Sequence, residues 1–96
     1  MKISYDYDGV LSVAKYQEQA ARQVEAGDDV YVISARHDKV NMIPTADKVG
    51  IFRSRVYAEG SNSAKVARIK AMNIDRHYDN NPDVIKLLPG VGVLIS

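Results

Sequence analysis

Hydrophobic and polar positions along this chain follow two patterns that alternate from end to end. Short apolar runs predict strands at residues 2–5, 30–33, 55–58 and 91–95, and context alone places another strand at 76–78. Between the strands, apolar residues recur every three or four positions, the spacing of one helix face. The run at 30–33 is continuous rather than alternating, which is typical of a strand buried on both faces of a parallel sheet.

Helices are predicted in the intervening segments, over residues 12–26, 38–49, 62–72 and 82–88. The first has Ser12 as its N-cap and Gly27 where a terminating glycine belongs. The second is weaker because Pro44 interrupts it. The third begins at a cap supplied by Asn62 or Ser63. The fourth follows the cap Asn81, with a proline in its first turn and the Pro-Gly pair 89–90 after its end.

Strands that alternate with helices predict an α/β fold. We expect right-handed crossovers and a parallel sheet of about five strands with helices on both faces, a three-layer Rossmann-like arrangement. A chain of 96 residues suits one domain with a modest core, so residues 1–96 are predicted to form a single domain. Ligands of such sheets bind at the carboxyl ends of the strands. The residues that follow each strand are therefore the candidates for chemistry.

Polar side chains follow four of the predicted strands. They are Asp6 and Asp8, then Ser34, Arg36 and His37, then Glu59, and finally Asp79, Asn80 and Asp83, with Lys65 in the helix after the third strand. Several carboxylates at one edge repel one another unless a cation lies between them. Oxygen donors in a chain without cysteine favour Mg²⁺. A serine hydroxyl and a lysine beside them supply the hydrogen-bond donor and the positive charge that a phosphate group needs.

Composition narrows the classes of protein to consider. With 46% hydrophobic and 26% charged residues, the chain is typical of a soluble globular protein. Its net charge of +1 creates no global field that would recruit nucleic acid or an anionic membrane. No apolar run approaches the ~20 residues that span a bilayer, and the N-terminus lacks an apolar signal segment. We therefore expect a cytoplasmic protein without a membrane partner.

The ordered set of strand-end residues resembles the four motifs of the haloacid dehalogenase superfamily. Asp6-Tyr7-Asp8-Gly9-Val10 looks like the first motif, Ser34 in Val-Ile-Ser-Ala-Arg is similar to the second, Lys65 matches the third, and the segment 79–83 matches the acidic fourth. Each motif alone is a weak signal. Their occurrence together, in the order of the family and across nearly the whole chain, is more specific.

The resemblance implies a Mg²⁺-dependent phosphohydrolase that acts on phosphomonoesters. Asp6 would attack phosphorus to form an aspartyl-phosphate, and Asp8 would act first as general acid and then as general base. Lys65 would neutralise charge on Asp6 and on the transferring group. The substrate phosphate would be bound by Ser34, Ala35 and Lys65, and the metal ion by Asp6, Asp8 and Asp79.

The fourth motif departs from the commonest pattern of the family. Asn80 stands where many members have a second acid, and Asp83 matches a version in which that acid comes four residues later. Asp83 is therefore either a further metal ligand or a residue whose charge favours the start of a helix. Arg36 and His37 are candidates for substrate contact, although such side chains are often simply solvated.

Neither interval that carries a cap domain in this superfamily has room for one here. One helix and one strand fill residues 9–33, and the same is true of residues 35–62. The resemblance thus implies a capless type, whose members tend to act on phosphates carried by large molecules. A nucleotide or nucleic-acid end is the first candidate, with contacts from Arg36, Arg53, Arg55 and Arg76. A homo-oligomer whose second subunit roofs the site over a small substrate is the alternative.

Two other classes of protein compete with this interpretation. A response-regulator receiver domain also has Asp, Ser or Thr, and Lys at strand ends. It needs its phosphorylated Asp after the third strand, where this chain has Glu59. A related module that binds phosphate or a partner without turnover is the second alternative. Asp6 and Asp8 argue against it, whereas Asn80 and the short segment after the first strand keep it open.

Overall fold

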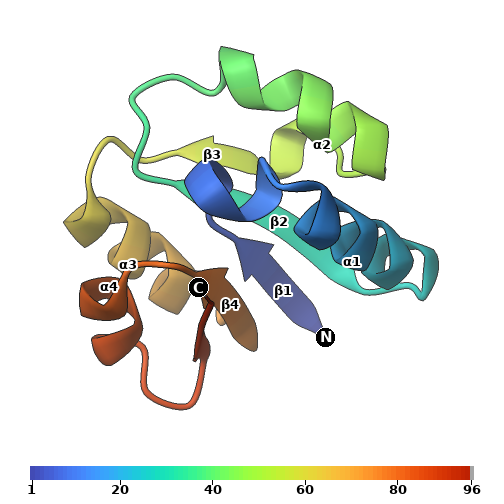
Figure 1. Cartoon of the computed structure of the whole chain (residues 1–96). Coiled ribbons are helices and arrows are strands. Elements are labelled where there is room, and N and C mark those ends of the chain that lie inside the picture. Colours follow the sequence, from blue (N-terminus) through green and yellow to red (C-terminus); the bar gives the residue numbers. More distant parts are fainter. Residues whose placement is uncertain (96) are drawn as a thin grey trace.

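Parallel strands form the centre of the molecule, arranged as a five-stranded sheet in the order β3-β2-β1-β4-β5 (Figure 1). The strands are β1 (Lys2–Tyr5), β2 (Asp29–Ser34), β3 (Val56–Ala58), β4 (Arg76–Asp79) and β5 (Gly92–Leu94). The structure is a computed structural model and describes residues 1–95. Every neighbouring pair of strands is parallel, so the predicted α/β fold with a parallel sheet of about five strands is confirmed.

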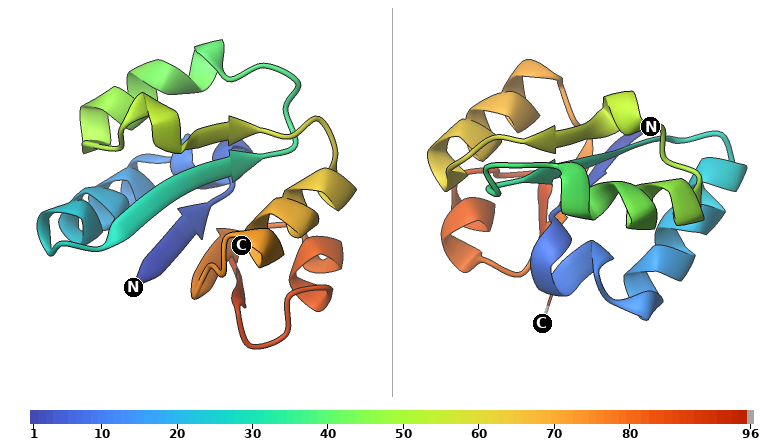
Figure 2. Two further views of the ribbon diagram at one scale, coloured as in Figure 1. Left: turned by 180° about the vertical axis from the view of Figure 1, so that it is seen from behind. Right: turned by 90° about the horizontal axis from the view of Figure 1, so that it is seen from above.

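Helices cover both faces of this sheet and make three layers (Figures 1 and 2). They are α1 (Ala14–Glu25), α2 (Ile43–Val49), α3 (Asn62–Ala71) and α4 (Pro82–Lys86). The core on the face of α1 and α2 includes Val30 and Val32 of β2. The core on the face of α3 and α4 includes Ile33, with Tyr31 packed against it. Alternate residues of β2 thus enter opposite cores, which explains its continuous apolar run.

The two central strands are joined through side chains on both faces of the sheet. Tyr5 of β1 lies opposite Tyr78 of β4, and their rings stack with centroids 4.9 Å apart. On the other face Ser4 lies opposite His77, and the Ser4 Oγ and His77 Nδ1 atoms are 2.7 Å apart. These contacts fix the register of the strands that carry Asp6 and Asp79.

The segment between β1 and α1 differs from the prediction. Ser12 does not cap α1, which begins at Ala14 after Val13. Residues 7–11 form an irregular turn in which Gly9 has a φ of +71°. Ser12 Oγ accepts a hydrogen bond from the main-chain N–H of Gly9 at 2.9 Å, so its hydroxyl stabilises this turn instead of the helix.

Other helix ends follow the prediction in part. Gly27 comes after α1 with a φ of +92°, and Asn81 caps α4, as predicted. Pro44 lies in the first turn of α2, where its missing N–H costs nothing, so it begins this shorter helix rather than interrupting a longer one. Ser61, instead of Asn62 or Ser63, caps α3 by accepting a hydrogen bond from the N–H of Ala64.

The strand order creates a crevice at the carboxyl edge of the sheet. The chain leaves β1 towards α1 on one face and leaves the adjacent strand β4 towards α4 on the other. Ligands bind where the connections of neighbouring strands diverge in this way. The order 3-2-1-4-5 matches Rossmann sheets and differs from the order 2-1-3-4-5 of receiver domains. The receiver interpretation therefore fails on topology as well as on Glu59.

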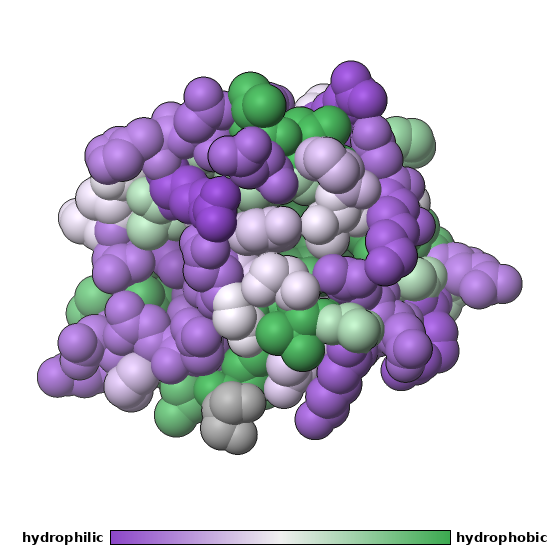
Figure 3. Space-filling model, turned by 45° about the horizontal axis from the view of Figure 1, so that its top comes forward, coloured by the Kyte–Doolittle hydropathy of each residue, from purple (hydrophilic) through white to green (hydrophobic). Residues whose placement is uncertain are grey.

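The surface on one side of the molecule is mainly hydrophilic (Figure 3). Hydrophilic residues predominate on the face shown in Figure 3, where hydrophobic residues lie in small separate groups. Within residues 1–95, none of the helices has the length and apolar character needed to cross a bilayer.

Candidate active site

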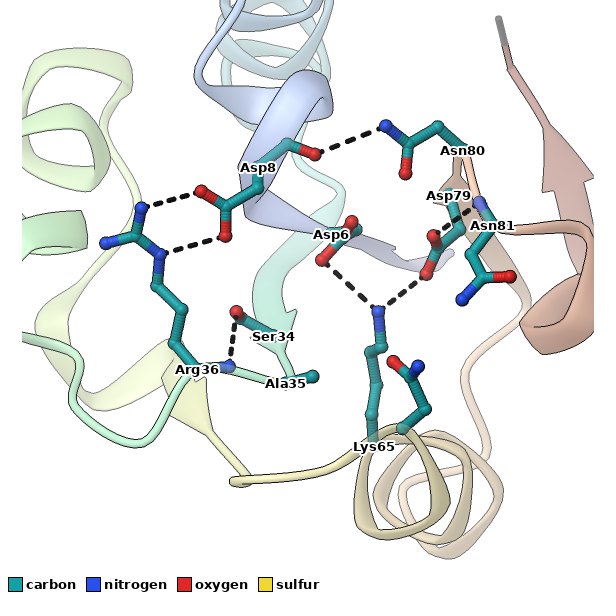
Figure 4. A pocket seen from close by; sticks show the side chains of 10 residues that line it. Asp6, Asp8, Ser34, Ala35, Arg36, Lys65, Asp79, Asn80 and Asn81 are labelled. Atoms are coloured by element: carbon teal, nitrogen blue, oxygen red, sulfur yellow. Dashed lines mark hydrogen bonds and ion pairs between the residues drawn. The ribbon is translucent and has the colours of Figure 1, made fainter.

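An open cavity of about 460 Å³ lies where the connections after β1 and β4 diverge (Figure 4). The residues that line it are Asp6, Asp8, Ser34, Ala35, Arg36, Asn62, Lys65, Asp79, Asn80 and Asn81. Most of these were predicted as site residues from the sequence. Asn62 and Asn81 were expected only at helix starts, because an Asn before a helix is usually explained by capping.

Lys65 lies at the base of this cavity and is only 2% exposed. Its Nζ donates hydrogen bonds to Asp6 Oδ1 at 3.2 Å and to Asp79 Oδ2 at 2.9 Å. A charged lysine is almost never buried without partners of opposite charge. The structure therefore does not support a solvated surface lysine at this position. Instead, one ammonium from α3 bridges the carboxylates that follow β1 and end β4 (Figure 4).

His77 is fully buried beside this bridge and was not identified from the sequence. Its Nε2 lies 2.8 Å from Asp79 Oδ2, and its Nδ1 lies 2.7 Å from Ser4 Oγ. Because a carboxylate only accepts hydrogen bonds, Nε2 must carry a proton, and in the neutral ring Nδ1 then accepts from Ser4. Asp79 Oδ1 also accepts from the N–H of Asn81 at 3.0 Å, so both oxygens of Asp79 are held.

The two carboxyl groups at the base differ in their pKa. Burial raises the pKa of the Asp6 carboxyl; the ammonium of Lys65 opposes this effect, and the charge of Asp79 adds to it. Burial also acts to raise the pKa of Asp79, but the hydrogen bonds from His77 and Lys65 outweigh it and leave the value lowered. Asp79 is therefore the more firmly ionised partner of Lys65. Asp6 is the carboxylate less satisfied by the protein.

Asp8 lies at the exposed rim of the cavity and is paired with Arg36. The Nε and Nη2 atoms of Arg36 donate to Asp8 Oδ2 and Oδ1 at 2.9 and 2.6 Å. The hydrogen bonds from Arg36 lower the pKa of the Asp8 carboxyl. The sequence had suggested Arg36 for substrate contact, without indicating that it would bind Asp8.

Ser34 and Asn80 occupy two further sides of the cavity. Ser34 Oγ accepts the main-chain N–H of Arg36 at 3.0 Å, which leaves its hydroxyl hydrogen available to a ligand. Asn80 Nδ2 lies 3.4 Å from the carbonyl oxygen of Asp8. A Cβ at Gly9 would lie 2.7 Å from Asn80 Nδ2. A larger residue there would displace the exposed Asn80 side chain, and the positive φ favours glycine.

Two candidate residues lie outside the cavity. Asp83 is exposed in the first turn of α4, where its N–H donates to Asn81 Oδ1 at 3.0 Å. This position supports its interpretation as a helix-start residue. His37 is also exposed, and its Nδ1 would be 3.3 Å from a Cβ at Gly60, so it packs against that turn and does not line the cavity.

Three arginines expected near the substrate also lie away from the cavity. Arg76 begins β4 and so lies at the opposite edge of the sheet from Asp79. Arg55 pairs with Asp29, the first residue of β2, at 3.2 Å. Arg53 pairs with Asp47 of α2 at 2.9 Å. Spacing along the sequence could not reveal these partners, because each pairing depends on how separate elements pack.

The oxygen atoms at the cavity are of the kind that bind a divalent cation. Within residues 1–95, no three His, Asp or Glu side chains are grouped so as to hold a metal ion. The donor chemistry nevertheless fits Mg²⁺, because Asp6, Asp79 and Asn80 offer only oxygen ligands at the cavity. The charges also fit, since one ammonium at Lys65 faces the two carboxylates of Asp6 and Asp79.

Comparisons with models of protein families, with curated proteins and with solved structures found no match to this chain. The topology of the sheet and the contacts within the cavity are therefore what indicate a function.

Proposed function

We propose that this chain is a Mg²⁺-dependent phosphomonoester hydrolase of the capless haloacid dehalogenase type, which acts through an aspartyl-phosphate on Asp6. The observation that supports this most is the position of Asp6. It follows the central strand β1, contacts the buried ammonium of Lys65, and lines an open cavity together with Asp8. A carboxylate at such a cavity can attack an electrophile, and the buried ammonium can stabilise charge on the transferred group.

In the first step a carboxylate oxygen of Asp6 attacks the phosphorus of the bound ester. A P–O bond to Asp6 forms while the bond to the ester oxygen breaks, and the electron pair of the broken bond leaves with that oxygen. Asp8 gives its proton to the departing oxygen, which leaves as a neutral alcohol. Lys65 and the hydroxyl of Ser34 donate hydrogen bonds to phosphoryl oxygens during the transfer.

In the second step water attacks the phosphorus of the aspartyl-phosphate. Asp8, now ionised, accepts a proton from this water while the bond between phosphorus and the Asp6 oxygen breaks. Inorganic phosphate leaves, and Asp6 is restored as a carboxylate. The same side chain thus serves as acid and then as base, which requires it to be free of other strong partners at the moment of transfer.

Asp6 and Asp79 would hold the Mg²⁺ ion through their carboxylates and Asp8 through its main-chain carbonyl oxygen, which lies beside Asn80, so that the Asp8 carboxyl stays available for proton transfer. A bound Mg²⁺ supplies positive charge that offsets the negative charge of the phosphoryl oxygens. Asp79 is suited to this role because His77, Asn81 and Lys65 already fix its orientation. Asp83 is not proposed as a ligand, since it lies outside the cavity.

One observation favours a second candidate, a module that binds phosphate or a partner without turnover. Both carboxylate oxygens of Asp8 are engaged by Arg36, whose hydrogen bonds lower the pKa of that carboxyl. An acid held ionised in this way has no proton to give. The two candidates therefore differ in whether Arg36 releases Asp8 when a ligand binds.

Phosphate release from a generic aryl phosphate, measured with and without Mg²⁺, tests the proposal. We expect release that requires Mg²⁺, is supported by Mn²⁺ or Co²⁺, and is abolished in Asp6→Asn. Asp8→Asn should slow turnover about 10²- to 10⁴-fold through loss of acid–base catalysis. Full activity in excess chelator would refute the metal assignment. No release by the wild type, together with measurable phosphate binding, would favour the binding module.

The cavity constrains the class of substrate less than it constrains the reaction. Of the four arginines expected to contact a nucleic-acid end, only Arg36 lines it. A phosphorylated nucleic-acid end is therefore less well supported than the sequence suggested. The same holds for any substrate that needs several basic side chains in a row. Comparing a panel of phosphorylated metabolites with phosphorylated oligonucleotides would rank these substrates directly.

A further inference from the structure

Arg36 occupies the carboxylate that the proposed reaction needs as its proton donor. Its guanidinium engages both oxygens of Asp8, at 2.9 and 2.6 Å. While this pair persists, Asp8 cannot form a hydrogen bond to an ester oxygen in the cavity. Efficient turnover therefore needs Arg36 to move to another partner, and a substrate can supply that partner.

The ion pair lies where such an exchange is easy. The side chains of Arg36 and Asp8 are 35% and 60% exposed, and exposed ion pairs contribute little to stability because water screens them. The backbone of Arg36 is fixed by its hydrogen bond to Ser34 Oγ, and its guanidinium lies 5.0 Å from the ring centroid of Tyr7. The side chain can thus turn from Asp8 to a ligand without movement of the main chain.

Charge within the cavity indicates which ligand would take Arg36. Among the described residues that line it, the cationic side chains are Lys65 and Arg36. Lys65 is buried at the base and committed to Asp6 and Asp79. Arg36 is at the rim, beside the residue that would protonate the leaving oxygen. An anion that meets Arg36 would therefore belong to the alcohol part of the substrate, and not to the phosphoryl group that Asp6 attacks.

On these grounds we infer that Arg36 selects phosphomonoesters whose alcohol part carries a second anionic group, a carboxylate or a phosphate, by exchanging Asp8 for that group. The inference rests on the proposed phosphatase function. A guanidinium binds carboxylates and phosphates through the same paired hydrogen bonds that it now makes to Asp8. Binding of a substrate with a second anion frees Asp8 for the leaving oxygen, whereas an ester without that anion is hydrolysed more slowly because Asp8 is free only when the exposed ion pair opens.

A matched pair of substrates tests this inference. β-Glycerophosphate and the corresponding phosphoglycerate differ only in a carboxylate that replaces one hydroxymethyl group. For the wild type we expect kcat/KM to be about tenfold or more higher for phosphoglycerate, the range expected for hydrogen bonds to a charged group. In Arg36→Gln this ratio should fall to near one, and Arg36→Lys, which keeps the charge but not the paired geometry, should give an intermediate ratio.

Arg53→Gln is the matched control. Arg53 also pairs with an aspartate through two hydrogen bonds, to Asp47 at 3.3 and 2.9 Å, but it lies outside the cavity. Its substitution should leave the preference for phosphoglycerate unchanged. A glycerol bisphosphate, which carries a second phosphate and no carboxylate, shows in the same assay whether a phosphate serves as well as a carboxylate.

The outcomes separate this inference from the proposed function. Hydrolysis of both esters that depends on Asp6, with equal kcat/KM and no response of the ratio to Arg36→Gln, would overturn the role of Arg36 and leave the phosphatase intact. Absence of any Asp6-dependent phosphate release would overturn the phosphatase, and the inference with it. A preference for phosphoglycerate that is lost in Arg36→Gln and kept in Arg53→Gln would support both.

Discussion

Asp6 and Asp79 share the ammonium of Lys65, yet their environments shift their pKa values in opposite directions. Asp79 gains hydrogen bonds from His77 and Asn81 in addition to that ammonium. Asp6 is nearly as buried but has fewer hydrogen-bond partners. Its ionised form therefore lowers the stability of the folded protein. Such a group is expected where a side chain serves a ligand and not the stability of the free protein.

Asp6→Asn should therefore raise the melting temperature at neutral pH. The pKa of Asp6 is raised in the folded state, so its contribution to stability is present below the unfolded value and is lost as pH rises through the folded value. The advantage of Asp6→Asn should shrink as pH falls towards about 3.8, where the wild-type carboxyl is protonated. Thermal unfolding across this range measures it, and a lower melting temperature for Asp6→Asn at neutral pH would contradict it.

Asp79→Asn is the matched control and should behave in the opposite way. Its lowered pKa contributes stability that is present above the unfolded value and is lost as pH falls through the folded value. Its hydrogen bonds to charged or buried partners should make the substitution cost about 1.5–3 kcal/mol of unfolding free energy at neutral pH.

Gly9→Ala should destabilise the protein and disturb the cavity. The added Cβ would meet Asn80 Nδ2 at 2.7 Å and would require a φ of +71°. Gly27→Ala is the control, since Gly27 also has positive φ (+92°) but no atom within 4 Å of its added Cβ. Both should lose about 1–2 kcal/mol through backbone strain, and Gly9→Ala should lose more. Equal losses in denaturant unfolding would show that the contact with Asn80 contributes nothing.

At the scale of elements, the pairing of β1 with β4 connects the core to the cavity. Polar residues Ser4 and His77 lie in these two strands and are fully buried. Their hydrogen bonds continue through Asp79 to Lys65, so a chain of contacts runs from inside the sheet to the base of the cavity. A buried network in which every polar group has a partner holds its members in one geometry.

Ser4→Ala should loosen this network without removing a residue from the cavity. His77 Nδ1 would lose its hydrogen-bond partner, which should cost about 1–3 kcal/mol of unfolding free energy. Because His77 then holds Asp79 less firmly, we also expect a higher Mg²⁺ concentration for half-maximal activity. Gln19→Ala, which removes a hydrogen bond from α1 to the hydroxyl of Tyr5 and lies outside the cavity, is the control for stability alone. An unchanged Mg²⁺ requirement in Ser4→Ala would assign the network a purely structural role.

The elements illustrate what sequence patterns can predict. Apolar runs located β1, β2, β3 and β5, because hydrophobic residues recur in these strands. β4 could be placed only by context, since its buried residues His77 and Asp79 are polar and satisfied by partners from other elements. For the same reason His77 was missed as a site residue. Only the presence of Ser4 and His77 within strands expected to be buried could have indicated a polar network.

At the scale of the whole molecule, the strand order decides which residues meet. Spacing along the chain predicted that Asp6, Ser34, Lys65 and Asp79 lie at one edge of the sheet, and all four line one cavity. The order β3-β2-β1-β4-β5 itself could not be predicted, because a hydrophobic pattern reports burial and not neighbours. That order makes β1 and β4 adjacent, which lets one lysine bridge Asp6 and Asp79 and leaves Asp83 outside.

Mg²⁺ should stabilise the folded protein if the cavity binds it. An ion that binds only the folded state at about one hundred times its dissociation constant adds about 2.7 kcal/mol. We expect Mg²⁺ to raise the melting temperature of the wild type and of Asp83→Ala, and to have little effect on Asp79→Asn. Loss of the effect in Asp83→Ala would make Asp83 a ligand after all and would move the proposed metal site.

The most direct test of the central claim is to look for phosphate bound covalently to Asp6. The protein would be mixed with a radiolabelled phosphomonoester and Mg²⁺, quenched in acid during turnover, and digested for mass spectrometry. We expect a hydroxylamine-labile phosphoryl group on the peptide that contains Asp6, and none in Asp6→Asn. Asp8→Asn lacks the base of the second step, so we expect more bound label per turnover in this variant than in the wild type. Rapid turnover without any such label, or with the label on another residue, would contradict it.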